Sequence, residues 1–334
     1  MKQETIYIRH LSTGYPGKGG TKVVAQDVNA VIRSGELTCL LGANGVGKST
    51  LLRTLSAFQP PVGGEIEIMG KRLSDYTDRQ LAKVIGVVLT EKCSLRNMTV
   101  EELVGMGRSP YTGFWGTLSK EDKRIVDDAI AMVKIEPLAH RMVHTLSDGE
   151  RQKVMIAKAL AQETPIIFLD EPTAFLDFPS KVEIMQLLHR LSHRMNKTIF
   201  LSTHDLELAL QIADKVWLMD RERGVIVGTP EDLSIDGSLS RFFLRKEIAF
   251  DTETGLFRIE HAFERNIRLS GEGCRYAMAR KALARNGIRA CREVASDIYI
   301  KVKEEDYLVH LPGGKEIKAV TIEEMLEQVI MTDE

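Results

Sequence analysis

A glycine-rich run near residue 45 carries the most specific chemical signal in this sequence. It fits the pattern G-x-x-x-x-G-K-[ST] and follows the apolar segment Leu37 to Leu41, which reads as a strand. Its glycines let the backbone curl with N–H groups pointing inward, and the helix that begins near Lys48 directs its partial positive end at bound phosphates. Lys48 adds a point charge, and the hydroxyl of Ser49 can bind Mg²⁺. The pattern predicts a nucleoside triphosphate site built from Gly42, Asn44, Gly45, Gly47, Lys48, Ser49 and Thr50.

Two carboxylates follow a second apolar segment. Asp170 and Glu171 come directly after Ile166 to Leu169, and ligands of open α/β sheets bind beyond the carboxyl ends of the strands. A polar loop after a buried strand is the commoner explanation of such a pair, but the presence of a phosphate loop favours a functional one. We expect Asp170 to hold Mg²⁺ and Glu171 to be the general base for the water that attacks the γ-phosphate.

A third run, Leu146-Ser147-Asp148-Gly149-Glu150, precedes a predicted helix from Arg151 to about Gln162. Ser147 and Glu150 have the S-x-x-E spacing of a capping box, which is a structural role. The same helix start exposes backbone N–H groups and the Ser147 hydroxyl, which together can bind an anion. The sequence therefore predicts a second anion site, distinct from the phosphate loop.

A parallel sheet is needed to position these residues. Two buried strands, Ile166 to Leu169 and Thr198 to Leu201, are separated by a helix around Ser180 to Met195. This alternation of strand and helix is typical of a parallel α/β sheet. The strand before the phosphate loop should belong to that sheet. Further strands are predicted for a β-rich lobe at Thr5 to Arg9, Val28 to Ile32 and Glu65 to Met69, and for a closing hairpin at Val216 to Met219 and Val225 to Val227.

Between about residues 75 and 165 the pattern turns helical. Thr99 begins a capping box, and Lys120 to Val133 has apolar positions at helical spacing. This predicts a helical insertion in a first domain of residues 1–245.

Beyond residue 245 the order of predicted strands and helices changes. It predicts a small accessory α+β domain, residues 246–334, which is large enough for its own core. Its predicted elements are strands at Phe250 to Ile259, Asn266 to Ser270 and Val294 to Val302, a helix at Cys274 to Arg285, a hairpin of Tyr307 to Leu311 with Lys315 to Val320, and a helix at Glu323 to Ile330.

Composition limits the functional classes. The 334 residues are 43% hydrophobic and 28% charged, with a formal net charge of -2, which argues against a globally basic nucleic-acid binder. Cys39, Cys93, Cys274 and Cys291 lie far apart, so reduced thiols in the cytoplasm are expected rather than a disulfide scaffold or zinc knuckle. Neither a signal peptide nor a membrane-spanning segment is indicated, so any membrane role should come through a partner.

The motifs together resemble, in order and spacing, those of the ATPase subunits of ABC transporters. They are Gly42 to Thr50, Leu146 to Glu150, Leu169 to Thr173, Ala174 to Asp177 and Thr203 to Asp205. The resemblance covers residues 5 to 235 and implies a P-loop NTPase of the ABC ATPase type, with a β-rich lobe, a RecA-like parallel sheet and a helical insertion.

The resemblance also implies a homodimer with ATP sandwiched at its interface. Lys48, Ser49, Asp170 and Glu171 of one subunit would face Ser147 and Gly149 of the other, which would explain two anion sites for each nucleotide. By the same resemblance, His204 would contact the γ-phosphate, Asp177 would cross the interface and Tyr15 would stack on adenine.

A narrower resemblance concerns the cargo. Gly107 to Gly113 and Leu118 to Asp122 look like the helical region of ATPases that serve importers of iron–siderophore complexes, haem and cobalamin. The alternative is a surface loop shaped by Gly, Ser and Pro, with Phe114 and Trp115 capping the helical lobe.

Two positions depart from the family pattern. Glu91 stands where a glutamine usually follows the strand Ile85 to Leu89, and we expect it to keep a contact with the metal while lacking the amide donor. Asp148 and Glu150 replace the glycine and glutamine most usual in the signature, and we expect Asp148 to point away from the nucleotide.

Two weaker features have ordinary alternatives. His189 and His193 have a spacing that can bind metal, but the sequence shows no third ligand, and we expect a solvated helix face instead. The basic residues Arg275, Arg280, Lys281 and Arg285 could form an anion or partner patch, or a plain solvated face.

The sequence thus predicts a magnesium-dependent ATPase subunit of an ABC importer, peripheral on the cytoplasmic face of the cell membrane. Its expected partners are a second copy, integral-membrane permease subunits and, indirectly, a substrate-binding protein, with no nucleic acid. One alternative is a soluble ABC ATPase that acts as an assembly or regulatory factor without a permease. Another is a module that binds ATP with little turnover.

Overall fold

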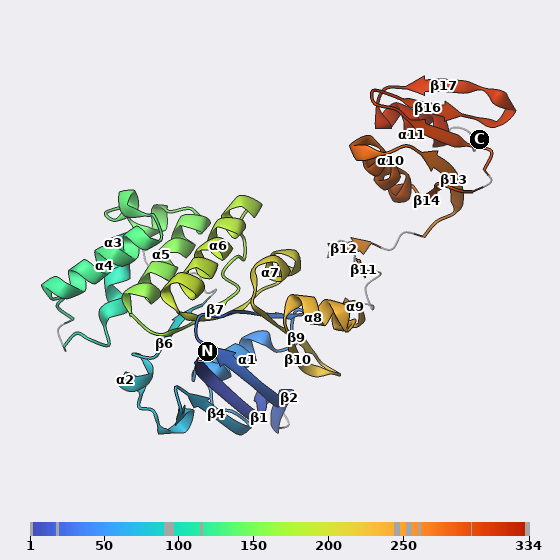
Figure 1. The fold of residues 1–334 in the computed structure, drawn as a ribbon. Helices are drawn as coiled ribbons and strands as arrows, with labels where there is room; N and C mark the ends of the chain where they lie inside the picture. The colour runs from blue at the N-terminus through green and yellow to red at the C-terminus, as the bar shows by residue number, and fades with distance from the viewer. Residues whose placement is uncertain are drawn as a thin grey trace. The chain divides into compact units, whose positions relative to one another are not determined.

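The computed structural model of the chain describes residues 3–17, 20–89, 97–113, 116–243, 248–251, 256–259, 262–294 and 296–330. Contacts between Cα atoms divide these residues into two compact units (Figure 1). The first unit consists of the residues up to Phe243 together with Phe250, Asp251 and Leu256, and the second consists of Ile248, Ala249 and the residues from Phe257 onward.

A six-stranded sheet in the order β10-β9-β3-β8-β7-β6 lies at the centre of the first unit. The pairs from β9 to β6 are parallel, and β10 is antiparallel to β9. The predicted parallel sheet and its closing hairpin are therefore confirmed. The strands are β3 (Leu37–Gly42), β6 (Ile85–Val88), β7 (Ile166–Asp170), β8 (Thr198–Ser202), β9 (Lys215–Asp220) and β10 (Gly224–Gly228).

Both faces of this sheet are buried. In β7, Ile166 and Phe168 belong to one apolar cluster, and Ile167 and Leu169 belong to another. A strand covered on both faces reads as a continuous apolar run, as β7 does, instead of alternating with polar residues.

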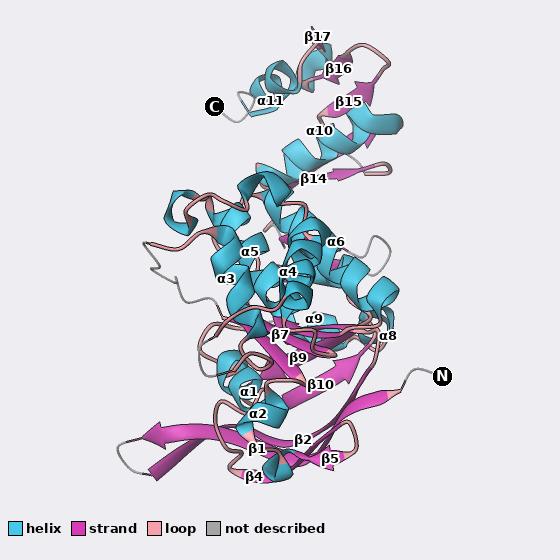
Figure 2. Ribbon diagram, turned by 90° about the vertical axis from the view of Figure 1, so that its left-hand side faces the viewer, coloured by secondary structure: helices cyan, strands magenta, loops and turns pink. Residues whose placement is uncertain are grey.

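An antiparallel sheet forms the predicted β-rich lobe, in the order β2-β1-β4-β5. Figure 2 shows this sheet on one side of α1 (Lys48–Leu55), with the six-stranded sheet on the other side. Apolar side chains of both sheets and of α1 form the cluster that contains Phe168. The strands are β1 (Glu4–Gly17), β2 (Gly20–Arg33), β4 (Gly63–Ile68) and β5 (Lys71–Arg72).

Helices cover the other face of the six-stranded sheet. Capping boxes begin α3, α4 and α5 at Thr99, Ser119 and Ser147, which confirms the boxes predicted at Thr99 and Ser147. Within the range 75–165, the strand expected at Ile85 to Leu89 is present as Ile85–Val88 and joins the sheet as β6. The helices are α2 (Asp78–Leu81), α3 (Val100–Gly105), α4 (Lys120–Met132), α5 (Asp148–Ala161), α6 (Phe178–Met195), α7 (Leu206–Ile212), α8 (Pro230–Ile235) and α9 (Ser238–Phe243).

The second unit is a five-stranded mixed sheet in the order β14-β13-β15-β16-β17, with two helices packed on it. β14 was not predicted, because its short Ile-Arg-Ala-Cys sequence shows no clear alternation, and the strand predicted at Val294 to Val302 is limited to β15. The elements are β13 (Arg265–Ser270), α10 (Gly273–Arg285), β14 (Ile288–Cys291), β15 (Tyr299–Val302), β16 (Tyr307–His310), β17 (Glu316–Ala319) and α11 (Ile322–Ile330). Before them, β11 (Ile248–Asp251) and β12 (Leu256–Ile259) form a separate two-stranded sheet.

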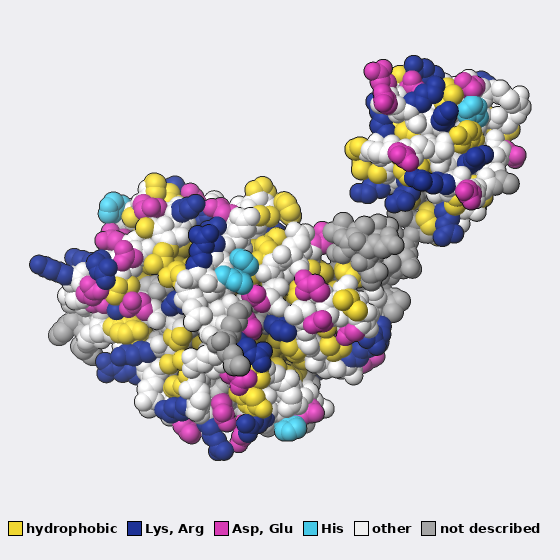
Figure 3. Space-filling view, in the orientation of Figure 1, with side chains coloured by type: hydrophobic (Ala, Val, Ile, Leu, Met, Phe, Trp, Pro, Cys, Tyr) yellow, Lys and Arg dark blue, Asp and Glu magenta, His cyan; other side chains and the backbone are white. Residues whose placement is uncertain are grey.

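The described helices include none that is both long and apolar enough to cross a membrane. On the face of the first unit drawn in Figure 3, basic and acidic side chains are interspersed.

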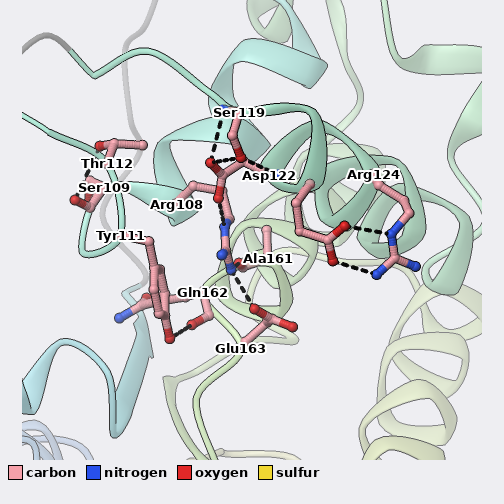
Figure 4. A network of polar contacts seen from close by, with 11 residues as sticks. Arg108, Ser109, Tyr111, Thr112, Ser119, Asp122, Arg124, Ala161, Gln162 and Glu163 are labelled. Atoms are coloured by element: carbon pink, nitrogen blue, oxygen red, sulfur yellow. Dashed lines mark hydrogen bonds and ion pairs between the residues drawn. The ribbon is translucent and has the colours of Figure 1, made fainter.

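A buried guanidinium connects the segment after α3 with α4 and with the end of α5, all within the helical insertion (Figure 4). Arg108 is 4% exposed. Its Nε donates to Asp122 Oδ1 at 2.8 Å, and its Nη1 donates to Ala161 O at 2.8 Å and to Glu163 Oε2 at 2.7 Å. The guanidinium also lies over the ring of Tyr111, 4.1 Å from the ring centroid. These contacts join the loop after α3 to both α4 and α5.

Asp122 is ionised in this network. Hydrogen bonds from Ser119 and Arg108 lower the pKa of Asp122 to about 2. The carboxylate therefore stays charged at neutral pH, and Arg108 is the cation that compensates it.

We expect Arg108→Ala to destabilise the first unit by about 3–5 kcal/mol, because it leaves the Asp122 carboxylate without its cation. The control is Arg124→Ala, since Arg124 pairs with Glu121 at 65% side-chain exposure and should contribute below about 1 kcal/mol. Urea unfolding followed by tryptophan fluorescence measures both losses, because Trp115 and Trp217 both precede Phe243. Equal losses in the two variants would contradict the role of Arg108.

Candidate functional site

The glycine-rich run forms a curled loop between β3 and α1. Gly45 has φ 70° and Gly47, the N-cap of α1, has φ 119°, so both adopt the conformation that glycine tolerates best. A Cβ at Gly47 would also lie 2.8 Å from Val24 Cγ2. The loop can thus approach a ligand with its backbone N–H groups in a way that side chains would prevent.

Lys48 is buried at the first position of α1. Its Nζ donates to Gly42 O at 3.0 Å and lies 3.4 Å from each ring nitrogen of His204. Burial lowers the pKa of Lys48, while the charges of Glu171 and Asp170 oppose that shift. The ammonium group therefore lies between the loop and the residues that follow β7 and β8.

Asp170 and Glu171 are positioned by the neighbouring strand β8. Asp170 is opposite Ser202 in the parallel register, and Ser202 Oγ donates to Asp170 Oδ1 at 2.6 Å. The N–H of Glu171 donates to Ser202 Oγ at 3.0 Å and to Ser202 O at 3.1 Å. Glu171 has φ 48°, a conformation that costs energy in a residue with a side chain. The hydrogen bonds with Ser202 hold the Asp170 carboxylate and the backbone of Glu171 at the end of the sheet.

His204 and Glu171 lie together in a cleft. His204 Nε2 is 2.5 Å from Glu171 Oε1. The cleft has a volume of about 550 Å³, and its walls include Glu171, Thr203, His204 and Asp205. A carboxylate base and an imidazole at one cleft wall can bind and activate a water molecule.

The donor set near Ser49 fits Mg²⁺. Ser49 Oγ donates to Asp170 Oδ1 at 3.3 Å, so a hydroxyl and a carboxylate from different elements meet at one point. Hard oxygen ligands of this kind suit Mg²⁺, which usually retains several waters and binds substrate phosphates as well. Asp170 and Ser49 would hold the ion and Mg²⁺ would neutralise phosphate charge. Glu91, the third predicted metal contact, lies outside the described residues.

Four further residues singled out from the sequence lie at the starts of helices or on a hairpin. Ser147 is the exposed N-cap of α5, and its Oγ accepts from Glu150 N at 3.2 Å. Asp148 pairs with Arg151 at 3.1 Å. Asp177 caps α6, and Tyr15 is partly exposed on the β1–β2 hairpin, with Lys22 Nζ 5.8 Å from the centre of its ring. The nucleotide contacts expected of Ser147, Asp177 and Tyr15 stay predictions, as does the expected orientation of Asp148 away from the nucleotide.

Two positioning residues were missed from the sequence. Ser202 bridges Asp170 and Glu171, and Arg221 Nη2 donates to Gly45 O at 2.9 Å. Ser202 is the last residue of a buried strand and directly precedes Thr203 and His204. A polar residue at that position could have been predicted from the sequence to lie at the site. Arg221 follows β9, and nothing in its local sequence indicates a contact with the loop.

The weaker candidates do not form metal sites in the described part of the chain. His189 and His193 stack with ring centroids 4.1 Å apart, and His193 pairs with Asp214 at 3.0 Å. Among the described residues no group of three or more His, Cys, Asp or Glu side chains could hold a metal ion. Cys39, Cys274 and Cys291 are free thiols.

The architecture and site define the chain as a P-loop nucleoside triphosphatase. A family model described as ABC transporter matches residues 25–174, and one described as iron ABC transporter C-terminal domain matches residues 264–329. An uncharacterized ABC transporter ATP-binding protein of Methanocaldococcus jannaschii is 39% identical over 252 residues, which are 75% of this chain and 86% of that protein. The chain therefore belongs to the ATP-binding proteins of ABC transporters, and it is an ABC ATPase, as predicted.

Other relatives have more specific descriptions. The iron(3+)-hydroxamate import ATP-binding protein of Bacillus subtilis is 35% identical over 248 residues, with 73% of this chain and 91% of that protein covered. A solved structure described as a metal-chelate type ABC transporter in an inward-facing conformation has a TM-score of 0.63 and 28% identity, covering 72% of this chain and 90% of that one. A dimeric bacterial ABC transporter cassette has a TM-score of 0.60 and 28% identity, covering 67% and 98%.

We expect Glu171→Gln and Lys48→Ala to separate hydrolysis from binding. Glu171→Gln removes the base but keeps the shape of the side chain, so ATP hydrolysis should fall by at least about 10²-fold with ATP affinity retained. Lys48→Ala removes the buried cation at the phosphate loop, so ATP affinity itself should fall. Equilibrium binding of a fluorescent ATP analogue and phosphate release measure the two effects. Full hydrolysis by Glu171→Gln would show that another group is the base.

Proposed function

We propose that this chain is the ATP-hydrolysing subunit of an importer of iron chelates. Iron–siderophore complexes are the first candidate cargo, with haem and cobalamin as further candidates. The observation that carries the proposal is the match of residues 264–329 to the iron ABC transporter C-terminal domain. The 35% identity to an iron(3+)-hydroxamate import ATP-binding protein and the similarity to a metal-chelate type transporter support the same cargo class.

In the proposed cycle, the loop from Gly42 to Thr50 binds the phosphates of ATP. Lys48 neutralises phosphate charge, while Ser49 and Asp170 would hold Mg²⁺. Glu171 takes a proton from the attacking water, and His204 contacts the γ-phosphate. The support for these last two roles is geometric, because Glu171 and His204 share one cleft wall and His204 lies beside Lys48 Nζ.

We further propose that two copies of the chain form the complete site. Ser147 and Gly149 of one copy would bind the γ-phosphate held by the other copy, Asp177 would cross the interface and Tyr15 would stack on adenine. Phe175 and Phe178, which flank Asp177, are 80% and 69% exposed. Large exposed apolar side chains beside a site are typical of a surface that a partner covers. The dimeric cassette among the similar structures supports this arrangement.

The importer would place the chain against permease subunits at the cytoplasmic face of the membrane, with a substrate-binding protein as an indirect partner. A groove of about 540 Å³ in the helical insertion is a candidate permease contact, and its lining includes Met106, Ser109 and Pro110. This groove contains part of the run that resembles the iron, haem and cobalamin importers. Met106 is 46% exposed, so an apolar side chain is available to a partner there.

Copurification tests the partner. A tagged chain extracted from gently solubilised membranes should bring a polytopic membrane protein with it. Met106→Arg should reduce the recovered partner at least about tenfold, because a charge would be buried in an apolar contact, while ATP hydrolysis by the isolated chain stays unchanged. Met132→Arg is the matched control, since Met132 is similarly exposed on α4 outside this groove.

Absence of a membrane partner from the wild-type extract would favour the soluble assembly or regulatory factor. Once the partner is found, uptake of labelled iron–siderophore complexes, haem and cobalamin by cells with and without the chain tests the cargo. Loss of haem or cobalamin uptake alone would overturn the choice of siderophore.

A further inference from the structure

Two neighbouring helices of the second unit carry opposite charges. α10 holds four basic residues and no acidic one, whereas α11 holds three acidic residues and no basic one. The two helices pack beside each other on the sheet, and Arg275 Nη1 of α10 donates to Val320 O, just before α11, at 3.2 Å. The helical layer of this unit is thus basic on one side and acidic on the other.

The charged side chains lie on the outer faces of the helices. Lys281 and Arg285 are four residues apart on α10, and both are exposed. Glu323 and Glu327 have the same spacing and exposure on α11. Within the described part of the chain, these four side chains form no ion pair or hydrogen bond with other side chains, so their charges are available to a partner.

Apolar side chains accompany both charged faces. Met278 is exposed on α10, and Ile330 is exposed on α11. Met278 precedes Lys281 by one helical turn, and Ile330 follows Glu327 by one turn. The surface therefore combines apolar side chains, which can form the core of a contact, with charged side chains, which can form its polar rim.

We propose that this surface binds the same surface of a second copy of the chain. The two-fold axis would lie in the plane of the interface and run lengthwise between α10 and α11. A rotation about this axis brings α10 of one protomer over α11 of its partner, and symmetry brings α11 of the first protomer over α10 of the partner. Every basic face then meets an acidic face. An axis that placed α10 over α10 would oppose like charges and is disfavoured.

The size of the surface determines how strong this contact can be. Two helices of this length, side by side, cover about 400 Å² per protomer, which is half of what a standard stable interface buries. The contact is therefore weak between free chains. The contact becomes stronger when the first units of two chains are already bound to each other. Each second unit is then covalently linked to the dimer, which raises the effective concentration of one second unit around the other. The accessory unit thus favours the dimeric form independently of nucleotide and cargo.

Sedimentation equilibrium of the full chain without nucleotide tests the proposal, because no ATP is present to close the first units. We expect a monomer–dimer equilibrium with a dissociation constant of about 10 μM to 1 mM. The dissociation constant should rise at least about fivefold between 0.1 M and 1 M salt, where the Debye length falls from about 10 Å to about 3 Å. A wild-type chain that is monomeric over this whole range would overturn the proposal.

Charge reversal gives the sharper test. The variant Lys281→Glu/Arg285→Glu and the variant Glu323→Lys/Glu327→Lys should each dimerise at least about tenfold more weakly than the wild type. An equimolar mixture of the two should associate about as well as the wild type, because each face then meets its opposite in the partner. Failure of the mixture to associate, with both variants folded, would contradict the proposed pairing of α10 with α11.

Two further variants complete the design. The chain with all four reversals keeps opposite charges on adjacent helices, so it should fold and dimerise as the wild type does even if the two-residue variants unfold. Lys301→Glu/Lys315→Glu is the matched control, because both lysines are exposed in the same unit but lie outside α10 and α11. Equal weakening by this control would show that net charge, and not the helical surface, governs association.

Discussion

The parallel register of β3, β8 and β7 is the constraint on which the site depends. It places the ends of three strands at one edge of the sheet, so the loop that ends at Lys48, the carboxylates after β7 and His204 after β8 lie together. Ser202 then fixes the positions of Asp170 and Glu171, because its hydroxyl donates to the Asp170 carboxylate and accepts from the N–H of Glu171. A slip in register by one residue would move every side chain of these strands to the opposite face, so it would disturb the packing of both apolar clusters and separate the reactive groups.

A second constraint concerns the helical insertion, which carries Ser147 at the start of α5. Arg108 connects the loop after α3 with Asp122 on α4 and with Ala161 at the end of α5. The three helices are therefore held together by a buried ion pair as well as by apolar contacts. A rigid insertion can present the capped end of α5 as one body, which a site shared between subunits requires.

Local patterns made most of the site predictable from the sequence. The phosphate loop, the carboxylates after an apolar strand and the capping box at Ser147 each depend on residues within a few positions of one another, and the structure has the expected elements at all three. Ser202 and Arg221 were not predicted, because their partners are distant in the chain: Ser202 bonds Asp170 across two strands, and Arg221 bonds Gly45. The short strand β14 was missed for a related reason, since it pairs with β13 and has no clear pattern of its own.

The central claim is that two chains complete one ATP site, and mixing two inactive variants tests it directly. Lys48→Ala disables the phosphate loop, and Ser147→Arg blocks the face that would meet the partner's nucleotide. A mixed dimer has one site with both defects and one site with neither, so randomly mixed chains should regain up to about a quarter of the wild-type ATP hydrolysis. Hydrolysis by the mixture that never exceeds the sum of the two variants measured separately would contradict the shared site.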